Sequence, residues 1–400
     1  MVKVLKYGGT SLASINQIKS IARDIKSRHQ AGQKLVIVLS AMGKSTDQLL
    51  KMIHQISPHP SKRELDMLLA TGEQVTIPLL STALKSIGVN AISLTGGQAG
   101  IQTNDHHAKA RIESIDTDLI EMHLHANTVV VIAGFQGVSA TGDITTLGRG
   151  GSDTSAVALA AALNGHCEIY TDVEGIYTVD PKYYPQARQL TQVSYDEMLE
   201  LASLGANVLE TRAVEMAHKF SIPLYVAKSH SQEVGTHIQC KSKLLEVPLI
   251  TGVSIDDQCV MASVKHLPFS PQNIATLFKA LSENQINVDM IAIAAPFEDH
   301  VNVSFTAPKT DLSSVHQVVN WLSKKHQGID ITSNDQIVKL SVVGLGMVSH
   351  SGVAASIFNL FADHNIHFFQ VTTSEISISY TILKGDAKKA AGLISEYFML

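Results

Sequence analysis

One sequence pattern occurs twice in the C-terminal part of the chain, and this repeat limits the possible folds more than any other feature. Residues 277–286 (LFKALSENQI) match residues 357–366 (IFNLFADHNI), 80 positions later. In both copies a strand-like segment precedes the pattern, two more follow it, and a helical segment ends the unit. Two βαββα units predict two small α+β domains. Residues 249–255 also read as a strand, which we expect to complete the sheet of the second unit.

The chain before the repeat alternates strands and helices. Six short segments are rich in valine and isoleucine, as buried parallel strands are. They lie at residues 2–5, 35–39, 90–94, 128–133, 167–171 and 223–227. Between them, Ser14 is expected to cap a helix with an apolar stripe, and Ser152 to start an alanine-rich helix. The alternation predicts an α/β domain whose mainly parallel sheet is sandwiched by helices.

These patterns divide the 400 residues into parts of domain size. We expect the α/β domain at residues 1–240 and a linker with the extra strand at residues 241–258. The two repeat domains are expected at residues 259–335 and 336–400.

Composition argues against several classes of protein. The net charge of −5 gives no support to a nucleic-acid partner. No apolar run approaches the roughly 20 residues of a membrane helix, and the N-terminus lacks a signal-peptide pattern. Three widely separated cysteines predict reduced thiols, so we expect a cytoplasmic protein without a membrane partner. The 18 histidines are scattered without ligand spacing, so no metal site built by the protein is expected.

The first predicted strand runs into Lys6-Tyr7-Gly8-Gly9-Thr10-Ser11. The lysine is expected to reach the surface as a mobile cation. The glycines let backbone N–H groups approach an oxygen-rich ligand without a Cβ between them. These residues indicate contact with an anion, but an ordinary strand-to-helix turn explains them equally well.

A second glycine-rich stretch, from Gly148 to Ser155, leads into the alanine-rich helix. Free N–H groups and the helix dipole at such a start favour a bound anion. Ser152 or Asp153 as a plain helix cap is the simpler alternative. Arg149 favours the ligand, because a capping turn needs no guanidinium whereas a bound carboxylate or phosphate does.

Three further segments place polar residues at the ends of predicted strands or helices. Thr71-Gly72-Glu73 comes before a helix expected to begin near Gln74. Residues 40–46 contain Gly43-Lys44-Ser45, but position 38 is valine where a Walker A loop needs glycine. Residues 171–182 follow a buried strand, where open α/β sheets bind ligands. A purely structural loop remains the alternative for residues 171–182.

In combination, these segments resemble the aspartate kinase (aspartokinase) family over essentially the whole chain. The matching pieces are residues 6–11, 71–73, 145–155, 171–182 and 373–376. The similarity is greatest to monofunctional, lysine-sensitive bacterial members. It implies an amino-acid-kinase fold followed by two ferredoxin-like βαββαβ (ACT) domains. It also implies ATP-dependent phosphorylation of the L-aspartate side chain to 4-phospho-L-aspartate, the first step of lysine, threonine and methionine biosynthesis.

The resemblance also implies roles for individual residues. Lys6 would stabilise the transferring phosphoryl group and Asp153 would orient Lys6. Arg149 would bind the α-carboxylate of aspartate and Glu73 its ammonium group. Further substrate contacts are implied for Ser40, Thr46, Gly150, Gly151 and Ser152. ATP is implied at Lys6, Tyr7, Gly8, Gly9, Thr171, Asp172, Tyr177, Thr178, Val179, Asp180, Pro181 and Lys182, with Mg²⁺ held mainly by ATP and water.

For regulation, the resemblance implies an amino-acid effector bound where two ACT units meet. The candidate residues are Ser270, Asn273, Ile274, Asn287, Val288, Asp289, His367, Ser374 and Glu375. Asp289 is expected to take the effector ammonium, and its counterpart in the second copy is Phe369. Packing in a dimer interface explains the same positions nearly as well. Lysine is the expected effector, ahead of threonine or diaminopimelate, and ACT pairing predicts a homodimer or tetramer.

The chain departs from the family pattern in three places. Asn207 stands where many relatives have lysine, Glu210-Thr211 where they often have His-Pro, and residues 270–274 lack a glycine after proline. Another amino-acid kinase, such as N-acetylglutamate kinase, is the alternative enzyme. The doubled C-terminal module and Glu73, which suits a free ammonium, disfavour it. A non-catalytic amino-acid sensor is the alternative of another class, and the joint presence of Lys6, Arg149 and Asp153 disfavours it.

Overall fold

The structure is a computed structural model, and it describes residues 1–206, 208–231, 233–240, 248–326, 328–350 and 352–400. The chain folds as two units. The first contains Met1–Ile176, Gln189–Ala202 and the described part of residues 207–244. The second contains Tyr177–Arg188, Ser203–Ala206 and the described part of residues 245–400. Asn207 and residues 241–247 of the expected linker lie outside the described residues.

An eight-stranded sheet forms the centre of the first unit, in the order β10-β12-β11-β9-β1-β2-β6-β3. All neighbouring pairs are parallel except β11 with β12. The six strands predicted from the sequence are confirmed within it. The strands are β1 (Val2–Tyr7), β2 (Lys34–Leu39), β3 (Ala91–Leu94), β6 (Val129–Ala133), β9 (His166–Thr171), β10 (Gln192–Ser194), β11 (Leu224–Lys228) and β12 (Thr236–Gln239).

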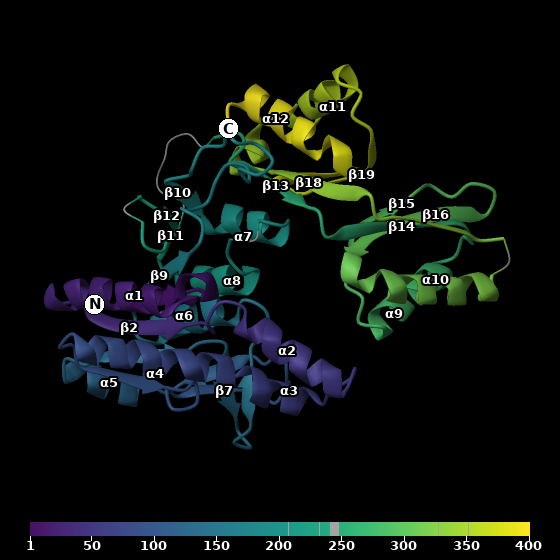
Figure 1. The fold of residues 1–400 in the computed structure, drawn as a ribbon. Coiled ribbons are helices and arrows are strands. Elements are labelled where there is room, and N and C mark those ends of the chain that lie inside the picture. Colours follow the sequence, from purple (N-terminus) through teal and green to yellow (C-terminus); the bar gives the residue numbers. More distant parts are fainter. Residues whose placement is uncertain (207, 232, 241–247, 327, 351) are drawn as a thin grey trace. The chain divides into compact units, whose positions relative to one another are not determined.

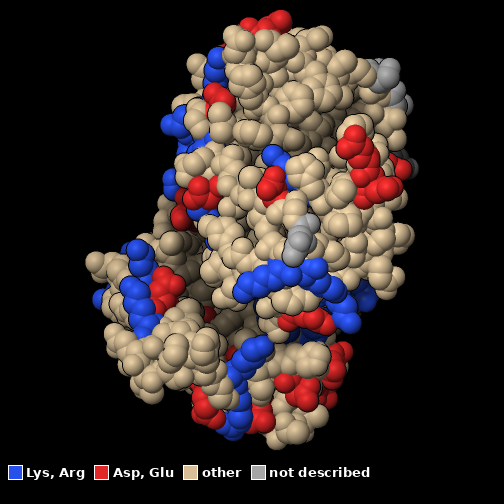
Figure 2. All heavy atoms as spheres, turned by 90° about the vertical axis from the view of Figure 1, so that its right-hand side faces the viewer, with Lys and Arg blue, Asp and Glu red and all other residues tan. Residues whose placement is uncertain are grey.

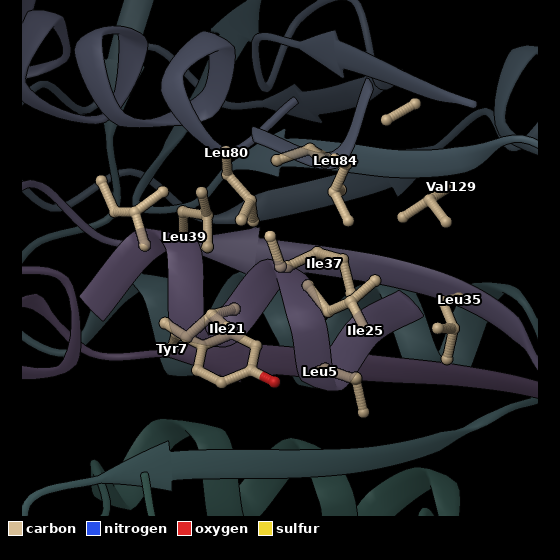
Figure 3. Close-up of a cluster of buried hydrophobic side chains, with 14 of the residues drawn as sticks. Leu5, Tyr7, Ile21, Ile25, Leu35, Ile37, Leu39, Leu80, Leu84 and Val129 are labelled. Carbon is tan, nitrogen blue, oxygen red and sulfur yellow. The ribbon is translucent and has the colours of Figure 1, made fainter. Parts of the chain in front are cut away.

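Helices cover both faces of this sheet (Figure 1). The helices in this part of the chain are α1 (Ile15–Gln30), α2 (Ser45–Ile56), α3 (Lys62–Leu69), α4 (Thr71–Ser86), α5 (Asp118–His125), α6 (Gly151–Ala162), α7 (Tyr195–Ser203) and α8 (Thr211–Phe220). Ser14 caps α1 as predicted, and its hydroxyl accepts a hydrogen bond from the N–H of Gln17. Apolar side chains of α1 and α4 pack on one face of β1, β2 and β6, as Figure 3 shows for Ile21, Ile25, Leu80 and Leu84.

Side chains alternate across β1, which decides what each face of the sheet receives. Leu5 and Tyr7 belong to the apolar core under α1 and α4. Lys6, between them, points to the opposite face, where α6 packs against β1 and α8 packs against α6. The strand therefore delivers one charged group to the α6 side of the sheet.

Two helix starts differ from the sequence-based expectation. Helix α4 begins at Thr71, so Glu73 lies in its first turn and not before it. Helix α6 begins at Gly151, with Gly150 as its N-cap residue in a left-handed conformation. The Ser152 hydroxyl is therefore inside the helix, where it is free to contact other elements.

A second, four-stranded sheet with the order β5-β4-β7-β8 was not predicted. Its strands have only three or four residues, too few for a periodic pattern to show. They are β4 (Ile101–Thr103), β5 (Ile112–Ile115), β7 (Gln136–Ser139) and β8 (Ile144–Thr146). Strand β8 leads directly into the glycine-rich loop before α6.

The second unit contains the two predicted repeat domains, each with its own apolar core. The first has sheet order β15-β16-β14-β17 and the second β13-β18-β20-β19. The elements are β13 (Gly252–Asp256), β14 (Cys259–Pro268), α9 (Pro271–Glu283), β15 (Asp289–Ile293), β16 (His300–Pro308), α10 (Leu312–Lys325), β17 (Asp330–Asn334), β18 (Ile337–Val343), α11 (Val353–Asp363), β19 (Phe368–Thr373), β20 (Ser377–Leu383) and α12 (Ala387–Phe398). Strand β13 pairs with β18, so a segment before the first copy belongs to the sheet of the second.

No helix among the described residues has the length and apolar character needed to cross a membrane. Acidic and basic side chains are interspersed over the face drawn in Figure 2.

A charged network joins helix α1 to two strands of the large sheet, β1 and β9. Glu168 accepts hydrogen bonds from Lys3 (2.9 Å), Arg28 (2.7 Å) and the hydroxyl of Tyr170 (2.7 Å). Burial alone would raise the pKa of Glu168, but these donors hold it below its usual value. The network therefore stabilises the fold while Glu168 is ionised.

We predict that Glu168→Gln lowers the free energy of unfolding by about 2 kcal/mol, because two cations lose their shared carboxylate. Since the folded-state pKa is depressed, this contribution is present above the unfolded-state pKa and disappears as pH falls through the folded-state pKa. Denaturant unfolding of both proteins at neutral and acidic pH measures the difference. Glu64→Gln, which alters an exposed pair with Arg63, is the control and should leave stability nearly unchanged. Equal losses in both variants would contradict the assignment.

Candidate active site

The loop after β2 brings several predicted site residues together. The hydroxyl oxygens of Ser40 and Ser152 lie 2.9 Å apart, which joins this loop to the start of α6. The N–H of Gly43 donates to the carbonyl of Gly9 (2.9 Å). A Cβ on Gly9 would lie 2.8 Å from the carbonyl oxygen of Ala41, so a side chain there would force the two loops apart. The site therefore lies at the carboxyl ends of the neighbouring parallel strands β1 and β2, where open α/β sheets bind ligands.

Lys6 and Asp153 form an ion pair in this region. Lys6 Nζ lies 2.5 Å from Asp153 Oδ1, and the two residues are only 7% and 8% exposed. The expectation of a lysine that reaches the surface is wrong, because α6 covers this face of β1. The first turn of a helix also favours the negative charge of Asp153. The pair therefore holds a preformed cation at the end of β1.

The start of α6 is shaped by glycine and not by a side-chain cap. Gly150, with φ +64°, is itself the N-cap residue, so the simpler alternative of Ser152 or Asp153 as a plain helix cap does not hold. Both side chains point instead to groups on β1 and on the loop after β2. A Cβ on Gly151 would lie 2.9 Å from Leu147 Cβ, so this turn is closely packed. Arg149, just before it, is exposed and available to a ligand.

Glu73 is a buried carboxyl group, and one of its two oxygens has no hydrogen-bond partner among the described residues. One oxygen accepts from the N–H of Ala41 (3.1 Å), and the other is buried without a partner. Burial raises the pKa of Glu73 to about 8, although two backbone hydrogen bonds oppose the rise. A ligand ammonium group would supply the missing partner and favour ionisation.

The structure gives several of the nucleotide-binding candidates partners within the protein. The Tyr7 ring is buried and stacks on Tyr170 with 5.0 Å between centroids, so it faces away from Lys6. The N–H of Gly8 donates to the carbonyl of Tyr170 (3.0 Å) and is already used. Thr171 ends β9, and its hydroxyl donates to the exposed carboxylate of Asp172 (3.1 Å).

The remaining nucleotide-binding candidates, residues 177–182, belong to the second unit. Thr178 and Val179 are buried, and the carbonyl of Thr178 accepts from the N–H of Val253 in β13 (2.7 Å). Lys182 pairs with Asp180 at 3.0 Å, and both side chains are largely exposed. Tyr177 is half-buried and Pro181 exposed. Within this unit, the segment extends the core of the second repeat domain.

Thr46 and Glu210 lie next to the two loops of the site. Thr46 lies half-buried in the first turn of α2. Glu210, noted in the sequence only as a departure from the family pattern, lies directly against Gly150. A Cβ on Gly150 would lie 2.8 Å from a Glu210 carboxylate oxygen. Burial, then the charge of Asp153, raises the pKa of Glu210, while Arg149 and Arg212 oppose the rise. Its place in the site follows from the packing of α8 on α6, which no local pattern reveals.

The effector candidates lie at three places in the second unit. Ser270 caps α9, and the amide of Asn273 donates to the carbonyl of Pro268 (2.9 Å). Ile274 and Val288 pack against the first repeat core, whereas Asn287 and His367 are exposed. Ser374 and Glu375 form the turn between β19 and β20, where Ser374 accepts from the N–H of Ser377 (3.0 Å).

Asp289, the expected acceptor of an effector ammonium, already has a partner in the structure. Lys339 Nζ from β18 lies 2.5 Å from Asp289 Oδ2, so the pair joins the two repeat domains. Burial opposes ionisation of Asp289, but the contact with Lys339 lowers its pKa overall. Sequence reasoning missed Lys339, although a single charged residue within the mainly apolar segment 337–343 was a usable signal.

We predict that Glu73→Gln removes a loss of stability that the wild type undergoes as pH rises from about 5 to about 8. The unfolded chain releases the Glu73 proton near pH 4.5 and the folded chain near pH 8. Wild-type stability should therefore fall across this window, by as much as ~1.4 kcal/mol per pH unit from this group. Denaturant unfolding at pH 5.5 and 7.5 compares the two slopes. The prediction fails if wild type and variant have the same slope.

Comparison with known proteins identifies the family. The model of the amino acid kinase family matches residues 1–228, and an ACT domain model matches residues 340–398. An aspartokinase of Geobacillus stearothermophilus is 47% identical over 394 residues, covering 98% of this chain and 95% of the relative. Escherichia coli aspartokinase III has the same fold in crystal structures with aspartate and ADP (TM-score 0.83) and with lysine and aspartate (TM-score 0.80). Each of these is 22% identical and covers 100% of both chains.

The fold and the family resemblance expected from the sequence are confirmed by these matches. The chain therefore belongs to the aspartokinases, within the amino acid kinase family.

Proposed function

We propose that this chain transfers the terminal phosphoryl group of ATP to the side-chain carboxylate of L-aspartate, giving 4-phospho-L-aspartate and ADP. One observation carries the proposal beyond family membership. A buried lysine, a buried carboxylate without a full set of partners and an exposed arginine occur in one unit, around the start of α6 and the loop after β2. These are the charges that a phosphoryl donor and a small amino acid require.

The proposed roles of Glu73 and Arg149 follow from the burial and charge of each side chain. Glu73 binds the α-ammonium of aspartate, which replaces the proton that burial favours on the free carboxylate. Arg149 binds the α-carboxylate as a charge-assisted pair. This leaves the side-chain carboxylate to attack the terminal phosphorus while the bond to the ADP oxygen breaks. An N-acetylated amino acid has no ammonium group, so it leaves Glu73 without a partner.

Lys6 acts on the phosphoryl group in transfer. Phosphoryl transfer needs positioning and charge neutralisation more than covalent help from the protein. Lys6 is held in place by Asp153 before any ligand arrives, so little reorganisation is needed in the transition state. Thr171 and Asp172 at the end of β9 are proposed to contact the nucleotide. The contacts at residues 177–182 stay predictions from the sequence.

Mg²⁺ is proposed to accompany ATP. Among the described residues, no three or more His, Cys, Asp or Glu side chains are grouped as ligands for a metal ion. Mg²⁺ keeps several waters and binds readily through phosphates. Its first ligands would then be ATP and water, and its charge would offset that of the phosphates.

The second unit is proposed to bind a feedback amino acid, with lysine as the first candidate. ACT pairing between chains would give a homodimer or tetramer. The two repeat domains are not equivalent, since Asp289 of the first corresponds to Phe369 in the second. Only the first domain therefore offers a carboxylate at this place.

The assay that tests the activity compares ADP release with L-aspartate and with N-acetyl-L-glutamate, each with ATP and Mg²⁺. We expect ADP release with L-aspartate and none with N-acetyl-L-glutamate. Release that depends on N-acetyl-L-glutamate would assign the chain to the alternative kinase, and release with neither would favour a sensor.

Lys6→Met should reduce turnover about a hundredfold or more, because a preformed donor to the transferring group is lost. It should also lower stability by about 3 kcal/mol, because Asp153 is left buried and unpaired. The double variant Lys6→Met/Asp153→Asn removes both charges and should recover stability without recovering turnover. Thermal melts and ADP release separate the two effects. Normal turnover in Lys6→Met would refute the catalytic role.

Feedback inhibition by lysine should weaken in Asp289→Ala. Because Asp289 also pairs with Lys339, the matched variant Lys339→Met distinguishes direct binding from loss of the ion pair. Direct contact with the effector predicts inhibition that persists in Lys339→Met, and dose–response curves measure it. Equal inhibition of Asp289→Ala and wild type would place the effector elsewhere.

A further inference from the structure

The residues of the loop that carries Arg149 do not by themselves determine its backbone conformation. Gly148 and Gly150 flank Arg149 with φ of +85° and +64°, and glycine adopts such angles without preferring them. Arg149 itself is exposed and is not held by burial. The position of the guanidinium therefore depends on what holds the loop from outside.

Arg212 of α8 is the first of these restraints. Its guanidinium donates to the carbonyl of Leu147 (3.1 Å), two residues before Arg149. It also donates to the carbonyl of Ala110 (3.0 Å), in the connection between β4 and β5. One side chain therefore fastens the Arg149 loop to a second loop.

That second loop packs under the first. The carbonyl oxygen of Ala108 would lie 3.1 Å from a Cβ on Gly148, so it fills the space left by the missing side chain. The N–H of Ala110 donates to the carbonyl of Thr146 at the end of β8 (2.9 Å). Ala108 has φ +69°, an unfavourable angle for a residue with a Cβ, so this loop in turn needs support.

Asp66 of α3 supplies that support. It is fully buried, and its carboxylate accepts from the N–H of Ala108 (3.0 Å to each oxygen), from His107 Nδ1 (2.8 Å) and from the hydroxyl of Thr146 (2.5 Å). Helix α3 is followed after Ala70 by α4, whose first turn holds Glu73. Asp66 therefore links the helix pair that carries Glu73 to the strand and loop that carry Arg149.

We propose that Asp66 and Arg212 are positioning residues, which fix Arg149 relative to Glu73 and thereby set the affinity for the amino-acid substrate. The inference rests on the proposed function, in which these two groups bind the two ends of one aspartate. Neither positioning residue is proposed to touch the reacting atoms. Each acts through the backbone of the Arg149 loop.

The test uses the full-length variants Asp66→Asn and Arg212→Met, with KM and kcat measured for aspartate and for ATP. We expect the KM for aspartate to rise at least about tenfold, with kcat and the KM for ATP within about twofold of wild type. A role in folding alone would reduce the amount of active enzyme and lower kcat without a selective change in one KM. Asp105→Asn in the same loop and Lys219→Met on α8 remove exposed charges and should leave all constants unchanged.

A double variant shows whether Arg212 acts through Arg149. Once Arg149→Met has removed the guanidinium, its placement no longer matters, so adding Arg212→Met should raise the KM for aspartate no further. The inference would be overturned if the KM increases of the two single variants multiply in the double variant. An unchanged KM for aspartate in Arg212→Met would also overturn it. If Asp66→Asn does not fold, the Arg212 variants decide the question alone. Wild type without aspartate-dependent ADP release would refute the proposed function and this inference together, whereas an active wild type with unaltered variants refutes only the inference.

Discussion

The ion pair between Lys6 and Asp153 is the contact on which the proposed active site depends. It spans from a strand at the middle of the large sheet to the first turn of α6, and both partners are nearly excluded from water. Two buried charges of this kind are tolerable only together, since either alone would carry a large desolvation cost. The pair therefore fixes α6 on the sheet and keeps a cation ready at the strand end.

Glu73 and Arg149, two other ionisable groups of the site, are not held in a buried ion pair as Lys6 and Asp153 are. Glu73 has an unpartnered buried oxygen and a raised pKa, and Arg149 is exposed on a loop between two glycines. In the proposed function, the first group is completed by the ammonium of the substrate and the second by its carboxylate. The site thus offers a preformed ion pair, a buried carboxyl group with one oxygen that lacks a hydrogen-bond partner in the described part of the chain, and an exposed guanidinium. This combination suits a zwitterionic amino acid beside a phosphate chain.

In the second unit an ion pair with a buried lysine joins the two repeat domains. Lys339 lies in the buried strand β18 and is 5% exposed, while its partner Asp289 belongs to the other domain. Breaking this pair leaves a buried lysine without a counter-ion, so a ligand that competes for Asp289 would also alter how the two domains meet. The Lys339–Asp289 pair therefore connects the proposed effector site to a change in packing.

The sequence by itself determined the alternation of strands and helices, the repeat and the family, because these depend on local periodicity and on residues adjacent in the chain. It also predicted that the strand before the first repeat joins the sheet of the second, as β13 does. It could not show that Lys6 is buried or that Ser152 and Asp153 are not caps. Those facts depend on which face of a strand meets which helix. Asp66 and Arg212 were missed for the same reason, since their partners lie 41 to 102 positions away in the chain. Only the tertiary structure decided how the glycine loop is held, because glycine leaves that choice to contacts from outside the loop.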